Sequence, residues 1–407
     1  MSVLAAGIIL GQLAGAAPPA GDAPVLTLSD RTEMRARTRL ARDGVAEDVE
    51  TTPLASLVVR GRRIEGSLAY AVHFGYLDFA QTPTFIVSQA ARLSLGYLAT
   101  RWLQLYVAGD GSIGEQFTDG LAAPTKLGSS PLPTTTSFTA PLPIINSAVY
   151  RAEVGFGYRL DRRWDLGASA MYSSGRGLDD VSRLIMPRYY GPSGTVTLGY
   201  QLNRTDRFAT AARATYTVTP SLGAKFFNTA VSETWTHAFA ERTTGVFGAG
   251  VSWQRSRDSS GAHPAYTFFP DAQVGLTHTV PLGFAETLSF QAIGRMGFSY
   301  DPVLRTSSPR ASAGLTAGWA RTQVGASAGL EYLAVLPSNP PRPAARQLSG
   351  NALVWYSAAP AVRLETGFRA YFQDLPAGLL LGPGTETNTL QWAVFVAAVL
   401  TAPPVQL

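Results

Sequence analysis

Apolar and polar residues alternate along many short segments of this chain. Between residues 147 and 160 the even positions are apolar, whereas the odd positions include Arg151, Glu153 and Arg159. The same alternation recurs in residues 287–300 and 362–372. Successive side chains of a β-strand point to opposite faces of the sheet, so this period predicts strands that build a wall with one apolar and one polar face.

A short phrase recurs where several of these segments end: an aromatic residue, a polar turn with arginine, then another aromatic residue. It pairs Tyr97 with Trp102, Tyr158 with Trp164, and Tyr200 with Phe208. Aromatic residues at the membrane interface, with a short turn in water between them, are typical of the rim of an outer-membrane barrel. We therefore predict an aromatic girdle that contains Tyr97, Trp102, Tyr158, Trp164, Tyr200, Phe208, Trp319 and Tyr356.

The connections between the strand-like segments alternate in length. Short turns are expected near residues 61–63, 100–101, 161–163, 203–206, 241–242, 281–284, 321–322 and 359–360, with a further short connection at 220–223. Longer loops are expected near 41–52, 77–86, 113–146, 174–193, 256–267, 301–309, 336–346 and 375–388. Short periplasmic turns and long extracellular loops distinguish the two ends of a transmembrane barrel.

These patterns predict an all-β fold. We expect one transmembrane antiparallel up-and-down β-barrel of about 18 strands (16–18) over residues 30–402, its first strand at 35–40 and both termini in the periplasm. Residues 1–17 read as a signal peptide, with an apolar middle and small residues at 14–16. The expected location is the outer membrane of a Gram-negative bacterium.

Composition supports a membrane barrel over a soluble β-sandwich. Only 15% of the 407 residues are charged, against roughly 25% in ordinary soluble domains. No stretch reaches the roughly 18 consecutive apolar residues that a spanning helix needs. The net charge of +5 comes from scattered arginines rather than a concentrated basic patch, which argues against nucleic-acid binding. The chain has no cysteine, which excludes disulfides and thiolate metal sites.

The parity of each strand assigns charged residues to the barrel interior. The expected lumen-lining residues are Arg92, Arg151, Glu153, Arg213, Arg295, Glu331, Arg363, Glu365 and Arg369. They admit two interpretations: a ladder of paired charges that keeps a wet lumen in shape, or a pore lining that selects solutes by charge. Opposite charges interleaved in this way predict weak selectivity with a slight preference for anions.

Catalytic and metal-binding patterns are not apparent. The four histidines, His73, His237, His263 and His278, form no close pair of the kind that zinc sites use. No histidine has a serine two residues away and no Asp-His dipeptide occurs, unlike in two known types of barrel enzyme. Residues distant in sequence could still meet across the lumen. We expect no enzyme activity, no metal and no cofactor.

Two segments carry a family resemblance. Residues 91–118 read ARLSLGYLATRWLQLYVAGDGSIGEQFT, and residues 157–177 read GYRLDRRWDLGASAMYSSGRG. They resemble a family of barrels encoded with bacterial exopolysaccharide-secretion systems. The resemblance implies a composite exit channel, in which a short periplasmic polysaccharide-export protein is the partner and polymer leaves through the barrel.

The leading functional hypothesis is therefore an outer-membrane channel for exported polysaccharide, surrounded by outer-membrane lipid. The alternatives are a general or weakly anion-preferring porin for small solutes, a barrel enzyme, and a plugged structural or receptor barrel. The loop at 113–146 is rich in proline, threonine and serine. A loop of this length is usually functional or disordered, and it is expected to fold into the pore or to cap it outside.

Overall fold

The computed structural model describes residues 24–38, 45–79, 82–117, 144–257, 265–283, 285–301, 306–336, 345–374 and 388–407. The expected signal peptide at 1–17 and most of the expected loop at 113–146 lie outside these residues. The long strands are β1 Val25–Thr38, β2 Val45–Arg60, β3 Ile64–Phe79, β4 Thr82–Leu98, β5 Leu103–Phe117, β6 Ile144–Arg159, β7 Trp164–Gly177, β8 Tyr189–Gln201, β9 Asp206–Thr219, β10 Ala224–Ala240, β11 Thr243–Arg257, β12 Ala265–Gly283, β13 Glu286–Asp301, β14 Thr306–Ala320, β15 Val324–Val335, β16 Arg346–Ala359, β17 Val362–Asp374 and β18 Asn388–Thr401.

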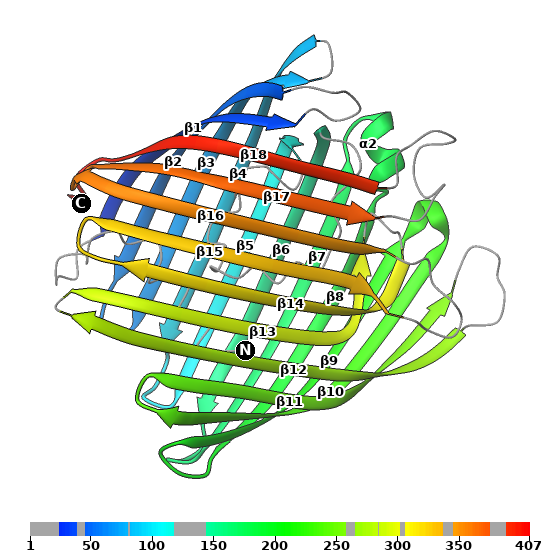
Figure 1. The fold of residues 1–407 in the computed structure, drawn as a ribbon. Helices are drawn as coiled ribbons and strands as arrows, with labels where there is room; N and C mark the ends of the chain where they lie inside the picture. Colours follow the sequence, from blue (N-terminus) through cyan, green and yellow to red (C-terminus); the bar gives the residue numbers. More distant parts are fainter. Residues whose placement is uncertain are drawn as a thin grey trace.

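The strands form one closed antiparallel barrel. Each long strand pairs with its neighbour in sequence, and β1 also pairs with β18, from Ser29 opposite Thr401 to Arg37 opposite Ala393. A two-residue strand, β19 (Val405–Gln406), pairs with the start of β1. Figure 1 shows the strands running obliquely around the wall. The predicted barrel of about 18 strands is confirmed, and closure leaves no unpaired sheet edge for the bilayer to cover.

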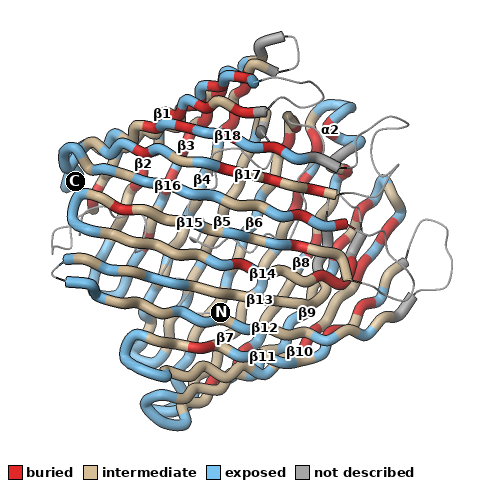
Figure 2. Tube along the Cα trace, in the orientation of Figure 1, coloured by how far each residue is buried: buried red, intermediate tan, exposed pale blue. Residues whose placement is uncertain are grey.

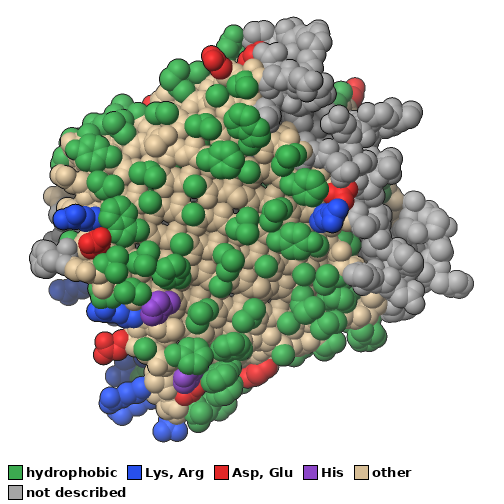
Figure 3. Space-filling model, viewed as in Figure 1, with side chains coloured by type: hydrophobic (Ala, Val, Ile, Leu, Met, Phe, Trp, Pro, Cys, Tyr) green, Lys and Arg blue, Asp and Glu red, His purple; other side chains and the backbone are tan. Residues whose placement is uncertain are grey.

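One parity of residues faces outward around the whole ring. Large apolar side chains such as Leu68, Leu93, Val154, Val231 and Val354 are each about half exposed on this parity. Figure 3 shows hydrophobic side chains spread over the outer wall, with charged residues gathered toward its ends. We call the opposite parity the lumen face. An exposed apolar wall around a polar interior is what a barrel in lipid requires.

The two ends of the barrel differ. We call the "turn end" the rim with the short turns at 61–63, 99–102, 160–163, 202–205, 241–242, 285, 321–323 and 360–361, and the opposite rim the "loop end". The expected short turns fall at or next to this end, except the short connection at 220–223. The Leu407 N–H donates a hydrogen bond to the Pro24 carbonyl at this end.

The loop end carries the two described helices, α2 (Asp180–Ile185) and the 3-10 helix η1 (Pro220–Leu222). Neither is long or apolar enough to cross a membrane. The η1 helix forms the expected short connection at 220–223, and it ends at Gly223, whose φ of 59° suits glycine.

The structure corrects several strand limits. The first strand is Val25–Thr38 rather than residues 35–40, so it also begins before the expected barrel limit at residue 30. Residues 45–52 belong to β2 and residues 82–86 to β4, where loops were expected. Residues 45–52 are acidic, and they can form a strand because Asp48 and Glu50 face arginines of β1 on the lumen face.

Candidate channel lumen

All nine charged residues expected in the interior lie on the lumen face. Strand pairing places them on β4, β6, β9, β13, β15 and β17, and the same parity continues from strand to strand around the ring. They do not form one site. The structure brings seven of them into three groups on different parts of the wall, while Glu153 lines a polar recess and Glu331 lies on β15, opposite Gly314.

The first group is a triad of Arg92, Asp110 and Arg151 on the adjacent strands β4, β5 and β6. Arg151 donates from Nε and Nη2 to Asp110 Oδ1 at 2.8 and 2.6 Å. Arg92 lies opposite Asp110 in the β4–β5 ladder and interacts electrostatically with both other members. Two guanidinium groups therefore share one carboxylate, and the triad carries one excess positive charge.

The second group repeats this composition with Arg213, Asp271 and Arg295. Arg213 on β9 reaches Asp271 on β12 at 3.3 Å, and Arg295 on β13 interacts with both. Three strand spacings, about 14 Å along the wall, separate β9 from β12. An arginine can bridge this distance only on the concave side, where side chains converge, so the contact identifies the lumen face independently. The small residues Ala230 and Gly250 on β10 and β11 leave the path open.

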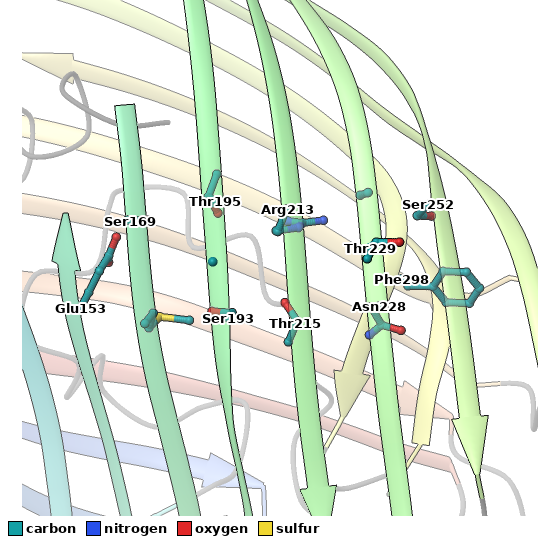
Figure 4. A pocket seen from close by; sticks show the side chains of 13 residues that line it. Glu153, Ser169, Ser193, Thr195, Arg213, Thr215, Asn228, Thr229, Ser252 and Phe298 are labelled. Carbon is teal, nitrogen blue, oxygen red and sulfur yellow. The ribbon is translucent and has the colours of Figure 1, made fainter. Parts of the chain in front are cut away.

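Beside Arg213 lies a polar recess of about 330 Å³. Figure 4 shows hydroxyl and amide side chains projecting into it from successive strands β7 to β11, with Glu153 at one side and Phe298 at the other. Glu153 accepts a hydrogen bond from the Tyr106 hydroxyl at 3.1 Å. The uncharged polar side chains that line the recess are Ser169, Ser193, Thr195, Thr215, Asn228, Thr229 and Ser252. Such a surface can form many exchangeable hydrogen bonds with hydroxylated solutes.

The third group crosses the seam where the first strand meets the last. Arg369 on β17 donates to both oxygens of Glu33 on β1, at 2.6 and 2.8 Å. Arg31 on β1 reaches back to Glu365 on β17 at 2.9 Å and also contacts Glu33 at 2.6 Å. Arg363 is ion-paired with Glu365 as well. Pairs with two parallel hydrogen bonds are the strong form of a salt bridge.

The sequence of β18 allows these contacts. β17 and β1 lie on either side of β18, about 9.5 Å apart. Ala393 and Ala397 on the lumen face of β18 are nearly fully buried beneath the charged side chains. Between them the Phe395 ring lies 4.0 Å from the guanidinium carbon of Arg369, a cation–π contact. Small residues and one flat ring thus let long side chains pass over β18.

The network continues from β1 onto β2. Arg35 is ion-paired with Glu50, and Arg37 contacts Asp48 at 2.5 Å. These four side chains and Glu33 are almost completely buried, and Figure 2 shows buried positions along β1, β2 and β18. We call Arg31, Glu33, Arg35, Arg37, Asp48, Glu50, Glu365 and Arg369 the "seam network".

Sequence reasoning found only Glu365 and Arg369 of this network. Arg31 and Glu33 precede the expected first strand, and Asp48 and Glu50 lie where a loop was expected. Arg35 and Arg37 lie in the expected first strand but were not assigned to the lumen. A signal was present: charges alternate with period two through Arg31, Glu33, Arg35 and Arg37, and again at Asp48 and Glu50. That period would have indicated two strands with charged lumen faces.

The residues expected in the aromatic girdle all lie at or next to the turn end. Trp102 is in the turn at 99–102, beneath the Arg101 guanidinium at 4.8 Å from its ring. The other seven are outward-facing strand residues. The rings of Trp164 and Tyr200 lie 4.5 Å apart, and Trp319 donates to Glu286 at 2.7 Å. A girdle role for these residues remains a proposal.

The described histidines are dispersed. His73 on the lumen face contacts Thr52 at 3.1 Å, His237 contacts Asp206 at 2.7 Å, and His278 contacts Thr243 at 2.7 Å. His263 lies outside the described residues. Within the part of the chain that the structure describes, no three His, Asp or Glu side chains are grouped as metal ligands.

Several solved structures are similar to this chain, at low sequence identity. The match to the ferric citrate transporter FecA in its unliganded form has a TM-score of 0.43 and 10% identity. It covers 90% of this chain but only 63% of the FecA chain. The match to OccAB2 of Acinetobacter baumannii has a TM-score of 0.46 and 9% identity, and it covers 93% of this chain and 98% of the OccAB2 chain. The match to a bacterial polysaccharide outer membrane secretin has a TM-score of 0.38 and 10% identity, and it covers 94% of this chain and 99% of the secretin chain.

Curated protein sequences give no match. The EpsX exopolysaccharide export family, in contrast, matches residues 25–353, which span the barrel from β1 into β16. This span includes both arginine–aspartate triads, the recess, and the β1 and β2 side of the seam network. The chain is therefore a member of the EpsX exopolysaccharide export family.

Proposed function

We propose that this protein is the outer-membrane conduit through which a secreted polysaccharide leaves the cell. The observation that carries the proposal is the family match over residues 25–353, on a chain that folds as a closed barrel with a polar interior. Barrels of 16–18 strands generally leave an aqueous channel.

The chemistry of the lumen face suits passage rather than tight binding. A sugar polymer presents many hydroxyl groups, and the recess offers hydroxyl and amide partners such as Ser169, Thr195 and Asn228. Many of the lumen charges are engaged with one another, as in Arg151 with Asp110 and Arg207 with Asp165. Conduction needs contacts that are favourable enough to admit the polymer and weak enough to release it.

The proposal includes an orientation and a partner. Short turns face the periplasm in this class of barrel, so the turn end and both termini would be periplasmic. A periplasmic polysaccharide-export protein would then deliver polymer to the turn end, and the loop end would open outside the cell. The lipid-facing aromatic residues near the turn end would lie at the inner leaflet of the outer membrane.

Gene deletion tests the conduit. Deletion is expected to abolish surface polysaccharide, measured by extraction and by surface staining, while growth on small nutrients stays normal. Expression of the wild-type chain from a plasmid should restore the polymer. Normal surface polysaccharide in the deletion strain, with the chain shown to be absent, would eliminate the export function.

A small-solute porin is the second candidate, and the interleaved lumen charges favour it. Pairs such as Arg151–Asp110 and Arg213–Asp271 line the wall without strong excess of one sign, as in a weakly selective pore. Liposome swelling with monosaccharides and amino acids measures this activity. Rapid uptake of small solutes, together with unchanged surface polysaccharide in the deletion strain, would establish the porin instead.

A further inference from the structure

Arginines are concentrated on the short turns of the barrel. We call Arg62, Arg63, Arg101, Arg162, Arg163, Arg204, Arg242 and Arg321 the "turn rim". They lie on the five short turns from residue 61 to residue 242 and on the turn at 321–323, and all eight are exposed. Figure 3 shows Lys and Arg side chains gathered at this end of the visible face.

The turn rim carries excess positive charge within the described residues. None of its eight guanidinium groups forms an ion pair with a carboxylate there. Neighbouring carboxylates are engaged otherwise: Asp161 accepts the backbone N–H groups of Arg163 and Trp164 at 2.6 and 2.7 Å, and Asp206 accepts from Trp235 at 2.8 Å. These hydrogen bonds hold the pKa of the Asp161 carboxyl below its usual value, so it stays negatively charged and offsets part of the rim. The eight arginines outnumber the carboxylates Asp161, Asp206 and Glu241 on or beside the same turns, so the rim keeps a net positive charge.

Within the lumen, positive charge is in local excess at the two triads. The triads Arg92–Asp110–Arg151 and Arg213–Asp271–Arg295 each contain two guanidinium groups and one carboxylate. Glu153 in the recess offsets one of these charges. Positive charge is thus in excess at the turn end and locally at the two triads, whereas the seam network is balanced.

From this arrangement we infer that the polymer is an acidic polysaccharide, which the turn rim captures and the lumen triads guide inward. The inference rests on the proposed function and names the substrate class. A cleft lined by one sign of charge focuses its field and raises the rate at which an oppositely charged molecule enters. Guanidinium groups also match carboxylate and sulfate geometry, the acidic groups that sugars carry.

Two other occupants could neutralise the turn rim: anionic phospholipid headgroups or an acidic protein. The observations favour the polymer because the excess arginines extend beyond the rim onto the lumen face. Phospholipid headgroups outside the barrel do not reach Arg92 or Arg213, and a protein docked on the turns meets the rim alone. A polymer that passes through the bore meets both sets.

The test is channel block in planar bilayers by sugar oligomers of equal length. The probes are an oligogalacturonate, a sulfated dextran oligomer and a neutral dextran oligomer. The chain lacks cysteine, so Thr322→Cys on an exposed turn provides a unique thiol that reports which side the turn end faces. We expect acidic probes added at the turn end to block at least about tenfold more often than neutral dextran at low salt, and less so at high salt.

A rim variant and a loop-end control test whether the turn-rim arginines cause the preference for acidic probes. The rim variant is R62Q/R63Q/R162Q/R163Q/R204Q, and it should lose most of the preference for acidic probes. The control removes exposed basic residues at the loop end, R176Q/R188Q/K225Q, and should keep it. Both should retain the wild-type conductance in potassium chloride, which verifies that the barrel is intact.

Each outcome has one meaning. Equal block by acidic and neutral probes, an unchanged rim variant, or stronger block from the loop end would overturn the inference while leaving the conduit standing. Failure of every oligomer to enter an open channel would count against the conduit itself. If acidic probes show no preference but the purified barrel retains phosphatidylglycerol that the rim variant loses, the rim binds lipid instead. A preference for carboxylated over sulfated probes, or the reverse, would identify the acidic group.

Discussion

Glu33 is the residue whose replacement should most weaken the barrel seam. Its side chain is only 2% exposed and lies within 2.6 Å of Arg31 and Arg369 and 3.8 Å of Arg35. Glu33→Gln keeps the shape but removes the charge and turns an amide donor toward these guanidinium groups. Removing one partner of a buried ion pair typically costs about 3–5 kcal/mol. We expect a loss in this range in the free energy of unfolding.

The assay is equilibrium unfolding in urea, with the barrel folded into phosphatidylcholine vesicles. Tryptophan fluorescence reports unfolding, and the band shift between heated and unheated samples in electrophoresis reports the closed barrel. A double-mutant cycle with Arg369→Gln measures the coupling between the partners. We expect the double variant to lose about 1–3 kcal/mol less than the sum of the single losses.

Asp110→Asn is the control, because it breaks a lumen ion pair of similar geometry that water reaches. The side chains of Arg151 and Asp110 are 51% and 42% exposed. Exposed pairs contribute about 1 kcal/mol or less. If Glu33→Gln destabilises the barrel no more than Asp110→Asn does, the seam network does not stabilise the closed barrel, and burial does not make its ion pairs more important than exposed ones.

Two further predictions concern local packing. A Cβ at Gly191 would lie 1.7 Å from the Tyr216 carbonyl oxygen, whereas a Cβ at Gly194 meets its nearest atom at 3.6 Å. Gly191→Ala should therefore lower the free energy of unfolding by about 1–3 kcal/mol and Gly194→Ala by much less, measured by urea unfolding; equal losses would contradict this. At the start of α2, the Asp179 carboxylate accepts the N–H and hydroxyl of Ser182, which lowers its pKa. Because the carboxyl pKa is lower in the folded state, the ionised carboxylate stabilises the helix at pH values above its unfolded-state pKa near 4. This stabilisation is lost as the pH falls through the folded-state pKa. The protection factor of the α2 amides, which is the intrinsic exchange rate divided by the measured rate at the same pH, should fall below about pH 4 in the wild type. In Asp179→Ala it should already be low at neutral pH; a wild-type protection factor that does not change with acid would be inconsistent with this cap.

Sequence alone was sufficient where the argument depended on local geometry. Alternation with period two identified strands such as 147–160 and assigned Arg151 and Glu153 to the face opposite Val154. The aromatic–arginine–aromatic phrase located the turns at 161–163 and 203–206. These features are local because the backbone of a strand fixes the side on which each side chain lies.

Strand limits were less predictable. Residues 45–52 were assigned to a loop because they are acidic and contain no apolar run, yet they form the start of β2. Their carboxylates Asp48 and Glu50 face arginines on β1. A strand can carry such residues only when a particular neighbour compensates their charge, and a single segment does not reveal its neighbour.

The sequence by itself determined that this chain forms a two-faced wall, which residues face each side, and where the wall turns. Only the tertiary structure decided which charges meet. Glu33 and Arg369 are 336 residues apart and come together because β1 pairs with β18. Arg213 and Asp271 meet across two intervening strands because the wall is concave. Closure and curvature are properties of the whole ring, since every strand contributes to the register that brings the ends together.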